Sequence, residues 1–114
     1  EMADHITISP IDGPVTVTAG STVLGTSHSA LELREGSLPP VIYVPREDIN
    51  MARLVATRHT TKCVWKGQAS YYSIKGDFGM LANAVWSYET PKDDVAAIAG
   101  HLAFYPDRVK VTRG

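Results

Sequence analysis

The sequence has very little cysteine: Cys63 is the one thiol among 114 residues. A lone thiol cannot form an internal disulfide bridge, and such scarcity is typical of proteins kept in a reducing compartment. No apolar run approaches the ~20 residues that cross a bilayer, and no charged-then-apolar leader is visible. Glu1 stands before Met2, which indicates an added residue ahead of the natural start. We therefore expect a cytoplasmic protein without a membrane partner.

The sequence also lacks an excess of charge of either sign. Eleven Lys and Arg residues face 12 Asp and Glu residues, which gives a net charge of −1. Proteins that bind nucleic acids gain most of their affinity from basic side chains on phosphates. The basic side chains around Arg58 and Lys62 favour a solvated face over a nucleic-acid groove, because Glu47 and Asp48 lie nearby in the sequence. We expect no nucleic-acid partner.

Motifs that hold metals or phosphates are missing as well. The sequence contains no Cys-x-x-Cys, His-x-His or His-x-x-x-His, and no glycine-rich phosphate-binding loop. His59 and Cys63 are four positions apart, which on a strand separates them by ~13 Å, too far for one tetrahedral ion. We expect neither a metal nor a cofactor.

What the chain does contain is a series of short β-branched and apolar segments divided by turn residues. Alternating residues 15–18 and 22–26 flank Gly20 and predict a hairpin. The segment 41–44 is apolar on both faces, which is typical of a central strand. The remaining predicted strands cover residues 29–34, 57–63, 68–74, 81–88, 102–105 and 109–111.

Helical patterns are few. Residues 49–54 predict one or two helical turns, and one longer helix is expected from Thr90, with Pro91 at its first position and Gly100 as its stop. The strands come too often, and the helix too rarely, for a parallel α/β sheet. We predict a single, mostly β domain over residues 1–114, with a twisted antiparallel sheet and one short α-helix in its C-terminal half.

Aromatic residues gather on predicted strand faces. Alternation places Ala69 and Tyr71 on one face of their strand, and Ala84, Trp86 and Tyr88 on one face of the next. If a tight turn pairs these strands, Tyr71 and Trp86 become cross-strand neighbours. Such an aromatic wall beside small alanines leaves room for a flat or apolar ligand. The alternative is that these rings are simply core.

Polar groups near these strands could anchor a ligand. Arg46 follows a predicted strand end, where loops often carry binding groups, and its guanidinium can bind a carboxylate or phosphate through two hydrogen bonds. We count it with Tyr43, Tyr71, Trp86 and Tyr88 as candidate ligand-binding residues.

Cys63 and Lys66 are the candidate catalytic residues. The ammonium groups of Lys62 and Lys66 could stabilise a thiolate, and the turn at Gly67 could leave the sulfur accessible. A catalytic thiol usually needs a base, and no histidine sits in a recognisable catalytic signature. The alternative is an inert, buried cysteine. Glu35 could act as an acid or base only if it is buried near the site, whereas its turn context predicts exposure.

Four motifs occur in an order that resembles the domain-of-unknown-function 427 family, over about residues 30–110. They are Tyr43-Val-Pro-Arg-Glu-Asp48, Cys63-x-x-Lys66-Gly67-x-Ala69-x-Tyr71, Trp86-Ser-Tyr88-Glu89-x-Pro91 and Gly100-x-x-Ala103-Phe104-Tyr105. The family usually has Cys-Pro-Tyr/Phe-Lys-Gly, and Val64-Trp65 replaces the middle pair here.

This resemblance implies a twisted β-tent, or Mss4-like, fold, related to methionine sulfoxide reductase B and the cereblon ligand-binding domain. Many relatives hold zinc with two Cys-x-x-Cys pairs, which this chain lacks. We interpret the chain as a binding module for a small molecule or a modified side chain. The alternative is a cysteine-dependent enzyme for thiol redox or acyl/amide transfer. A nucleotidyltransferase, the activity in another label of the family, is the third hypothesis, and no residue pattern supports it. The oligomeric state stays open, with a homodimer among the alternatives.

Overall fold

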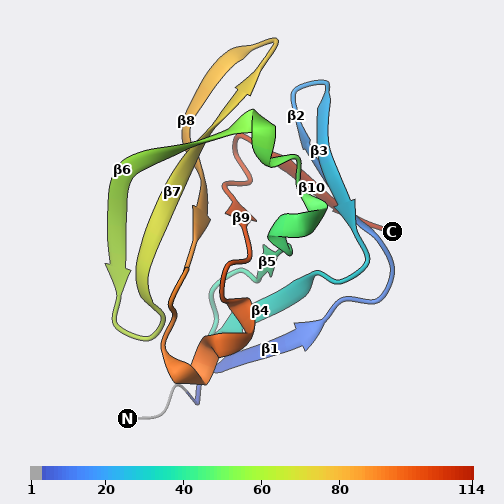
Figure 1. Ribbon diagram of the computed structural model, residues 1–114. Coiled ribbons are helices and arrows are strands. Elements are labelled where there is room, and N and C mark those ends of the chain that lie inside the picture. The colour runs from blue at the N-terminus through green and yellow to red at the C-terminus, as the bar shows by residue number, and fades with distance from the viewer. Residues whose placement is uncertain (1–3) are drawn as a thin grey trace.

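Most of the regular structure of the protein is β-strand. The computed structural model describes residues 4–114, and Figure 1 shows its elements. The strands are β1 (Ile6–Pro10), β2 (Val15–Ala19), β3 (Thr22–Ser27), β4 (Leu31–Glu35), β5 (Val41–Tyr43), β6 (Leu54–Cys63), β7 (Gly67–Gly76), β8 (Gly79–Ser87), β9 (Ala103–Phe104) and β10 (Lys110–Arg113). Three short 3₁₀-helices join them: η1 (Arg46–Asp48), η2 (Met51–Arg53) and η3 (Asp93–Ile98).

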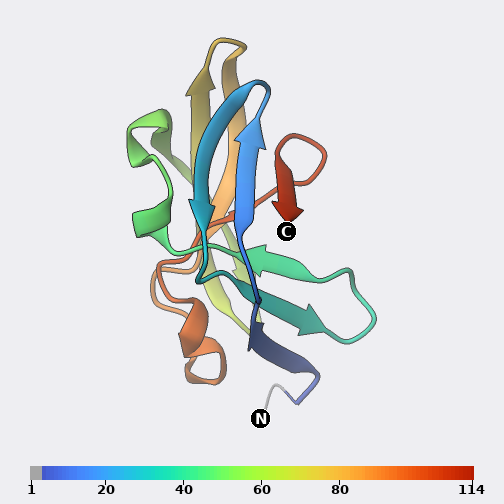
Figure 2. The same cartoon turned by 90° about the vertical axis from the view of Figure 1, so that its right-hand side faces the viewer.

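The strands form three open antiparallel sheets. Their orders are β6-β7-β8-β9, β10-β2-β3 and β1-β4-β5. The long β7–β8 hairpin and the β2–β3 hairpin point toward the same end of the molecule, whereas β1, β4 and β5 lie toward the other end (Figures 1 and 2). The predicted antiparallel, mostly β fold is therefore confirmed. None of the helices within residues 4–114 is long and apolar enough to cross a membrane.

The β2–β3 hairpin follows the alternation in its sequence. Val15, Val17 and Ala19 are buried, and the threonines between them are half-buried. A two-residue turn starts at Gly20, whose φ of +59° favours glycine. The predicted hairpin is confirmed, with one register shift after Val17.

Two predictions about the strands were wrong. Strand β5 lies at the edge of its sheet and not at the centre. Its run is apolar on both faces because Tyr43 and Val44 enter two different core clusters, and Val44 also bridges to Leu102. Strand β1 was missed, although Ile6 and Ile8 alternate with polar residues in it.

The expected α-helix near the C-terminal end is the 3₁₀-helix η3. It has no side-chain cap, and it bends at Val95. Lys92 N–H donates to the Lys66 carbonyl and Gly100 N–H donates to the Tyr88 carbonyl, each at 3.0 Å. These tertiary bonds fix both ends of a segment too short for a regular α-helix, whose first turn is costly to form. Gly100 does end it, with a φ of +70°.

The β7–β8 hairpin positions the aromatic residues. A tight turn pairs Gly76 with Gly79, and the ladder places Tyr71 directly opposite Trp86, as predicted. A β-bulge after Tyr72 lets Asn83 adopt a φ of +51°. The bulge shifts the register along β8, so that Trp86 and not Ala84 lies opposite Tyr71. On its other side, Trp86 pairs with Ala103 of β9.

The two small alanines that were predicted to flank the aromatic wall do not lie together. Ala84 packs in the larger core cluster with the β2–β3 residues, whereas Ala69 packs in the smaller one. The smaller cluster joins η3 to β4, β5, β7, β8 and β9, and Trp86 packs against it. Its buried members are Leu33, Tyr43, Ala69, Tyr71, Tyr88, Val95, Ile98 and Ala103.

Candidate functional site

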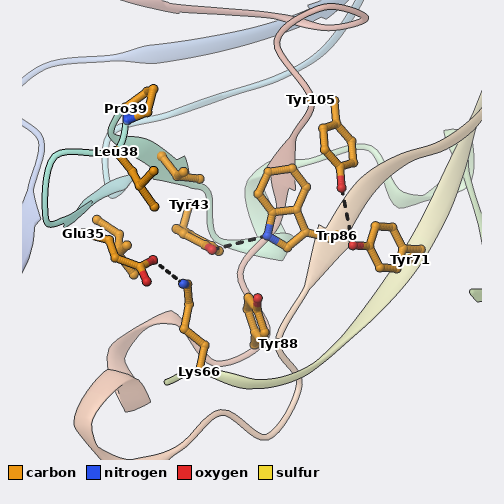
Figure 3. A pocket seen from close by; sticks show the side chains of 11 residues that line it. Glu35, Leu38, Pro39, Tyr43, Lys66, Tyr71, Trp86, Tyr88 and Tyr105 are labelled. Carbon is orange, nitrogen blue, oxygen red and sulfur yellow. Dashed lines mark hydrogen bonds and ion pairs between the residues drawn. The ribbon is translucent and has the colours of Figure 1, made fainter. Parts of the chain in front are cut away.

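A cavity of about 240 Å³ opens beside the smaller core cluster. Side chains from β4, β5, β7 and β8, with the loops after β4 and β9, surround it (Figure 3). Its walls combine aliphatic side chains, one ion pair and five aromatic rings. The rings belong to Tyr43, Tyr71, Trp86, Tyr88 and Tyr105. We call this space the aromatic cavity.

Trp86 is the central ring of the aromatic cavity. Its indole Nε1 donates to the Tyr43 hydroxyl at 3.3 Å, and the two rings meet edge to face. On its other side, Trp86 packs against Tyr105 with 4.6 Å between ring centroids. The small Ala103 opposite it on β9 leaves the indole room. The indole is therefore held by one hydrogen bond and two aromatic contacts.

Tyr71 is fixed through its hydroxyl. Thr61 Oγ1 lies 2.9 Å from that oxygen and the Tyr105 hydroxyl 3.4 Å from it. The imidazole of His59 meets the Tyr71 ring at 4.5 Å. These contacts tie the outer strand β6 to the loop after β9 across one side of the cavity.

A partly buried ion pair forms the polar end. Lys66, only 8% exposed, places Nζ 2.5 Å from Glu35 Oε1 and 3.5 Å from Cys63 Sγ. The other Glu35 oxygen lies 3.6 Å from His5 Nε2. Within residues 4–114, no three His, Cys, Asp or Glu side chains group together as a metal site would require.

The phenols of the cavity resist ionisation. Burial raises the pKa of Tyr43 to about 12, and it also raises the pKa of Tyr88. The hydrogen bond to Tyr71, followed by burial, raises the pKa of Tyr105 to about 12. The three hydroxyls therefore stay neutral and able to donate hydrogen bonds at physiological pH.

These shifts predict a loss of stability in strong base. A phenol whose pKa is higher in the folded state contributes stability that is complete below the unfolded pKa of about 10 and is lost as pH rises through about 12. Urea unfolding at several pH values should show the free energy of unfolding falling across this window, while tyrosinate absorbance rises together with unfolding. Titration of all tyrosines at about pH 10, with the fold intact, would contradict this prediction.

The structure brings most of the sequence-predicted site residues together. Tyr43, Lys66, Tyr71, Trp86 and Tyr88 all line the aromatic cavity. Their parts in binding or catalysis stay predictions. Two further lining residues, Glu35 and Tyr105, were missed as site residues. Glu35 is half-buried and not exposed, because Lys66 and His5 hold its carboxylate. The signals available were the apolar run that follows Glu35, from Leu38 to Tyr43, and the place of Tyr105 in the fourth sequence motif.

Cys63 and Arg46 lie outside the lining of the cavity. Cys63 is partly buried behind Lys66, against the smaller core cluster. Arg46 instead joins separate elements: its guanidinium donates to the Gly100 carbonyl at 3.0 Å, to the Tyr72 hydroxyl at 3.0 Å and to the Glu89 carboxylate at 2.5 Å. In this arrangement its hydrogen bonds go to the protein itself.

A comparison with known protein families found a match that covers nearly all of the chain. The model of a domain of unknown function, DUF427, matches residues 7–114, which is a longer stretch than the four sequence motifs span. A comparison with curated proteins found no match. The matched range includes every strand from β2 to β10 and all the residues that line the aromatic cavity. The chain therefore belongs to the domain-of-unknown-function 427 family.

Proposed function

We propose that the protein binds a small planar organic ligand in the aromatic cavity. The observation that carries this proposal is the convergence of five aromatic rings from distant parts of the chain on one cavity that also contains a partly buried ion pair. Rings that only fill a core close around one another, whereas these rings leave an open space (Figure 3).

The size and chemistry of the cavity limit the ligand. Drug-sized ligands occupy cavities of roughly 300–1,000 Å³, so about 240 Å³ suits a single ring with one polar substituent. Trp86 and Tyr71 offer faces and edges for stacking, which adds about 0.5–1.5 kcal/mol to the burial of a ring. Lys66, which is paired with Glu35, supplies an ammonium donor at the polar end.

Tryptophan fluorescence can test the proposal directly. The chain has two tryptophans, so Trp65→Phe leaves Trp86 as the single reporter inside the cavity. Titration of this variant with benzamide, benzylamine and benzoate should quench or shift its emission in a saturable way for at least one compound. Trp65 lies outside the lining and contacts the His5 ring, so its removal should leave binding intact.

A matched pair of variants provides the control. Calorimetry should show that Trp86→Ala weakens binding at least ~tenfold, as expected for a central interface aromatic, while Trp65→Ala binds like the unmodified protein. Equal affinities for the two variants would overturn the proposal.

The 3.5 Å contact between Lys66 Nζ and Cys63 Sγ favours one second candidate, a cysteine-dependent enzyme. An ammonium at this distance would stabilise a thiolate. Iodoacetamide labelling at neutral pH should then be slower in Lys66→Met than in Lys62→Met, because the side chain of Lys62 is exposed and has no hydrogen bond or ion pair with a described residue. Equal labelling rates, or a thiol inert in the folded protein, would argue against this candidate.

A further inference from the structure

We propose that the ligand is an amphiphilic ring carboxylate, with its acid group at the polar end of the aromatic cavity and an apolar tail in an adjoining groove. This inference rests on the proposed function and names the chemical class that the site would bind. Two independent observations carry it: the unused hydrogen-bond donors of the cavity, and the apolar surface that continues beyond Trp86.

The first unused donor is the Tyr88 hydroxyl. Tyr88 is only 7% exposed, and its hydroxyl forms no hydrogen bond with any residue from 4 to 114. No fully buried side-chain N or O atom of the described residues lacks a partner, so this unpaired oxygen must reach the open space of the cavity. In Figure 3 it points toward Trp86 and Tyr43, into the cavity.

Two more donors point to the same place. The Tyr43 oxygen accepts the indole N–H of Trp86, so its own proton is free for another acceptor. The Lys66 ammonium has three protons, and its recorded partners within the described chain are Glu35 and Cys63. Figure 3 shows the polar atoms of Tyr43, Lys66 and Tyr88 around one space.

This set of donors selects an anionic acceptor. The Glu35 carboxylate is already engaged by Lys66 and His5, and the nearby phenols are neutral. An incoming ammonium group would find no free carboxylate at this end, whereas a carboxylate could accept from both phenols and from Lys66. Hydrogen bonds to a charged group are about twice as strong as those between neutral groups.

The second observation is an apolar groove that shares a wall with the cavity. It has a volume of about 490 Å³ and includes the apolar side chains of Ile42, Phe104 and Val111. The side chains of Trp86 and Tyr105 line both spaces, together with those of Leu38, Pro39 and Val41. A ligand ring against Trp86 can therefore extend an apolar tail directly into the groove.

The experiment compares benzoate, 4-butylbenzoate and 4-butylbenzyl alcohol, with binding followed by Trp86 fluorescence in the Trp65→Phe protein. The tail should raise the affinity of 4-butylbenzoate over benzoate by up to ~fourfold for each buried methylene. The alcohol should bind at least ~tenfold more weakly than 4-butylbenzoate because it cannot provide an anionic acceptor.

Two substitutions test the polar end and the apolar groove separately, and a third is their control. Tyr88→Phe should weaken both carboxylates about tenfold while changing the alcohol little, and it breaks no hydrogen bond within the described protein. Val111→Thr should reduce the gain that the butyl group gives. Val23→Thr, on an exposed position of β3, serves as the matched control and should change none of the affinities.

The outcomes distinguish this inference from the broader proposal. Equal binding of 4-butylbenzoate and the alcohol, or no effect of the butyl group, overturns the inference. So does binding of benzamide or benzylamine together with failure of every carboxylate, although the cavity would then still bind ligands. If none of the five compounds binds, both proposals fall.

Discussion

Gly25→Ala is expected to destabilise the protein by about 3 kcal/mol or more, at the upper end of the cost of overpacking a core. A methyl group on Gly25 would overlap the backbone carbonyl oxygen of Asp48 and approach the Ile49 Cα to 3.2 Å. The neighbouring chain cannot easily retreat, because Asn50 N–H donates to the Leu24 carbonyl at 2.8 Å. Thermal unfolding should show a midpoint lower by roughly 10–20 °C.

Gly13→Ala is the matched control for this substitution. Gly13 has a positive φ of +82°, but a methyl group there meets no atom within 4 Å. Its cost should be limited to backbone strain of ~1 kcal/mol. Similar losses for the two variants would show that the contact between β3 and η1 is softer than the packing indicates.

Arg46→Ala is expected to lower the free energy of unfolding by about 3 kcal/mol. The guanidinium joins η1 to β7, to the segment after β8 and to the turn after η3, through Tyr72, Glu89 and Gly100. The guanidinium also donates to the Ser87 hydroxyl at 3.4 Å, so its removal takes this hydrogen bond from a fully buried residue. Urea unfolding monitored by tryptophan fluorescence measures the loss.

Two variants show whether geometry or charge is responsible. Arg46→Lys keeps the charge beside Glu89 but cannot reach the phenol and the carbonyl at once, so it should recover less than half of the lost stability. Arg58→Ala removes an exposed arginine of β6 with no hydrogen bond or ion pair to a described residue and should change stability by less than ~0.5 kcal/mol. Full recovery in Arg46→Lys would mean that the surface ion pair dominates.

The part of the site that sequence reasoning could predict is the local part. Alternation and a glycine turn fix a hairpin register, because a slip of one residue would turn every side chain to the opposite face. This rule predicts that Trp86 is a near neighbour of Tyr71, but their direct pairing depends on the register shift after Tyr72, without which Ala84 would lie opposite Tyr71. The buried faces of β2 and the stop at Gly100 were equally local.

The rest of the site depends on contacts between distant segments. Glu35 is drawn inward by Lys66, and the ring of Tyr105 meets Trp86 from another strand connection. Arg46 was predicted to bind a ligand because its partners, such as Tyr72, could not be located from spacing. The bulge that moves Ala84 to the other core cluster depends on Asn83, whose N–H donates to Ser73 Oγ. The alternation of apolar and polar residues in the sequence does not indicate where such a bulge lies.

The pairing of β10 with β2 has a consequence for the kinetics of folding. Lys110 lies opposite Thr18 and Arg113 opposite Val15, so this ladder has the longest sequence separation of the strand pairings among the described residues. The β2–β3 hairpin can form locally. Strand β10, however, must close a very long loop, and lose the corresponding chain entropy, before its hydrogen bonds with β2 stabilise the fold; such topologies fold slowly. Until β10 arrives, the outer edge of β2 exposes unpaired backbone groups that another chain could join. The period before that closure is when the protein should be most prone to aggregate.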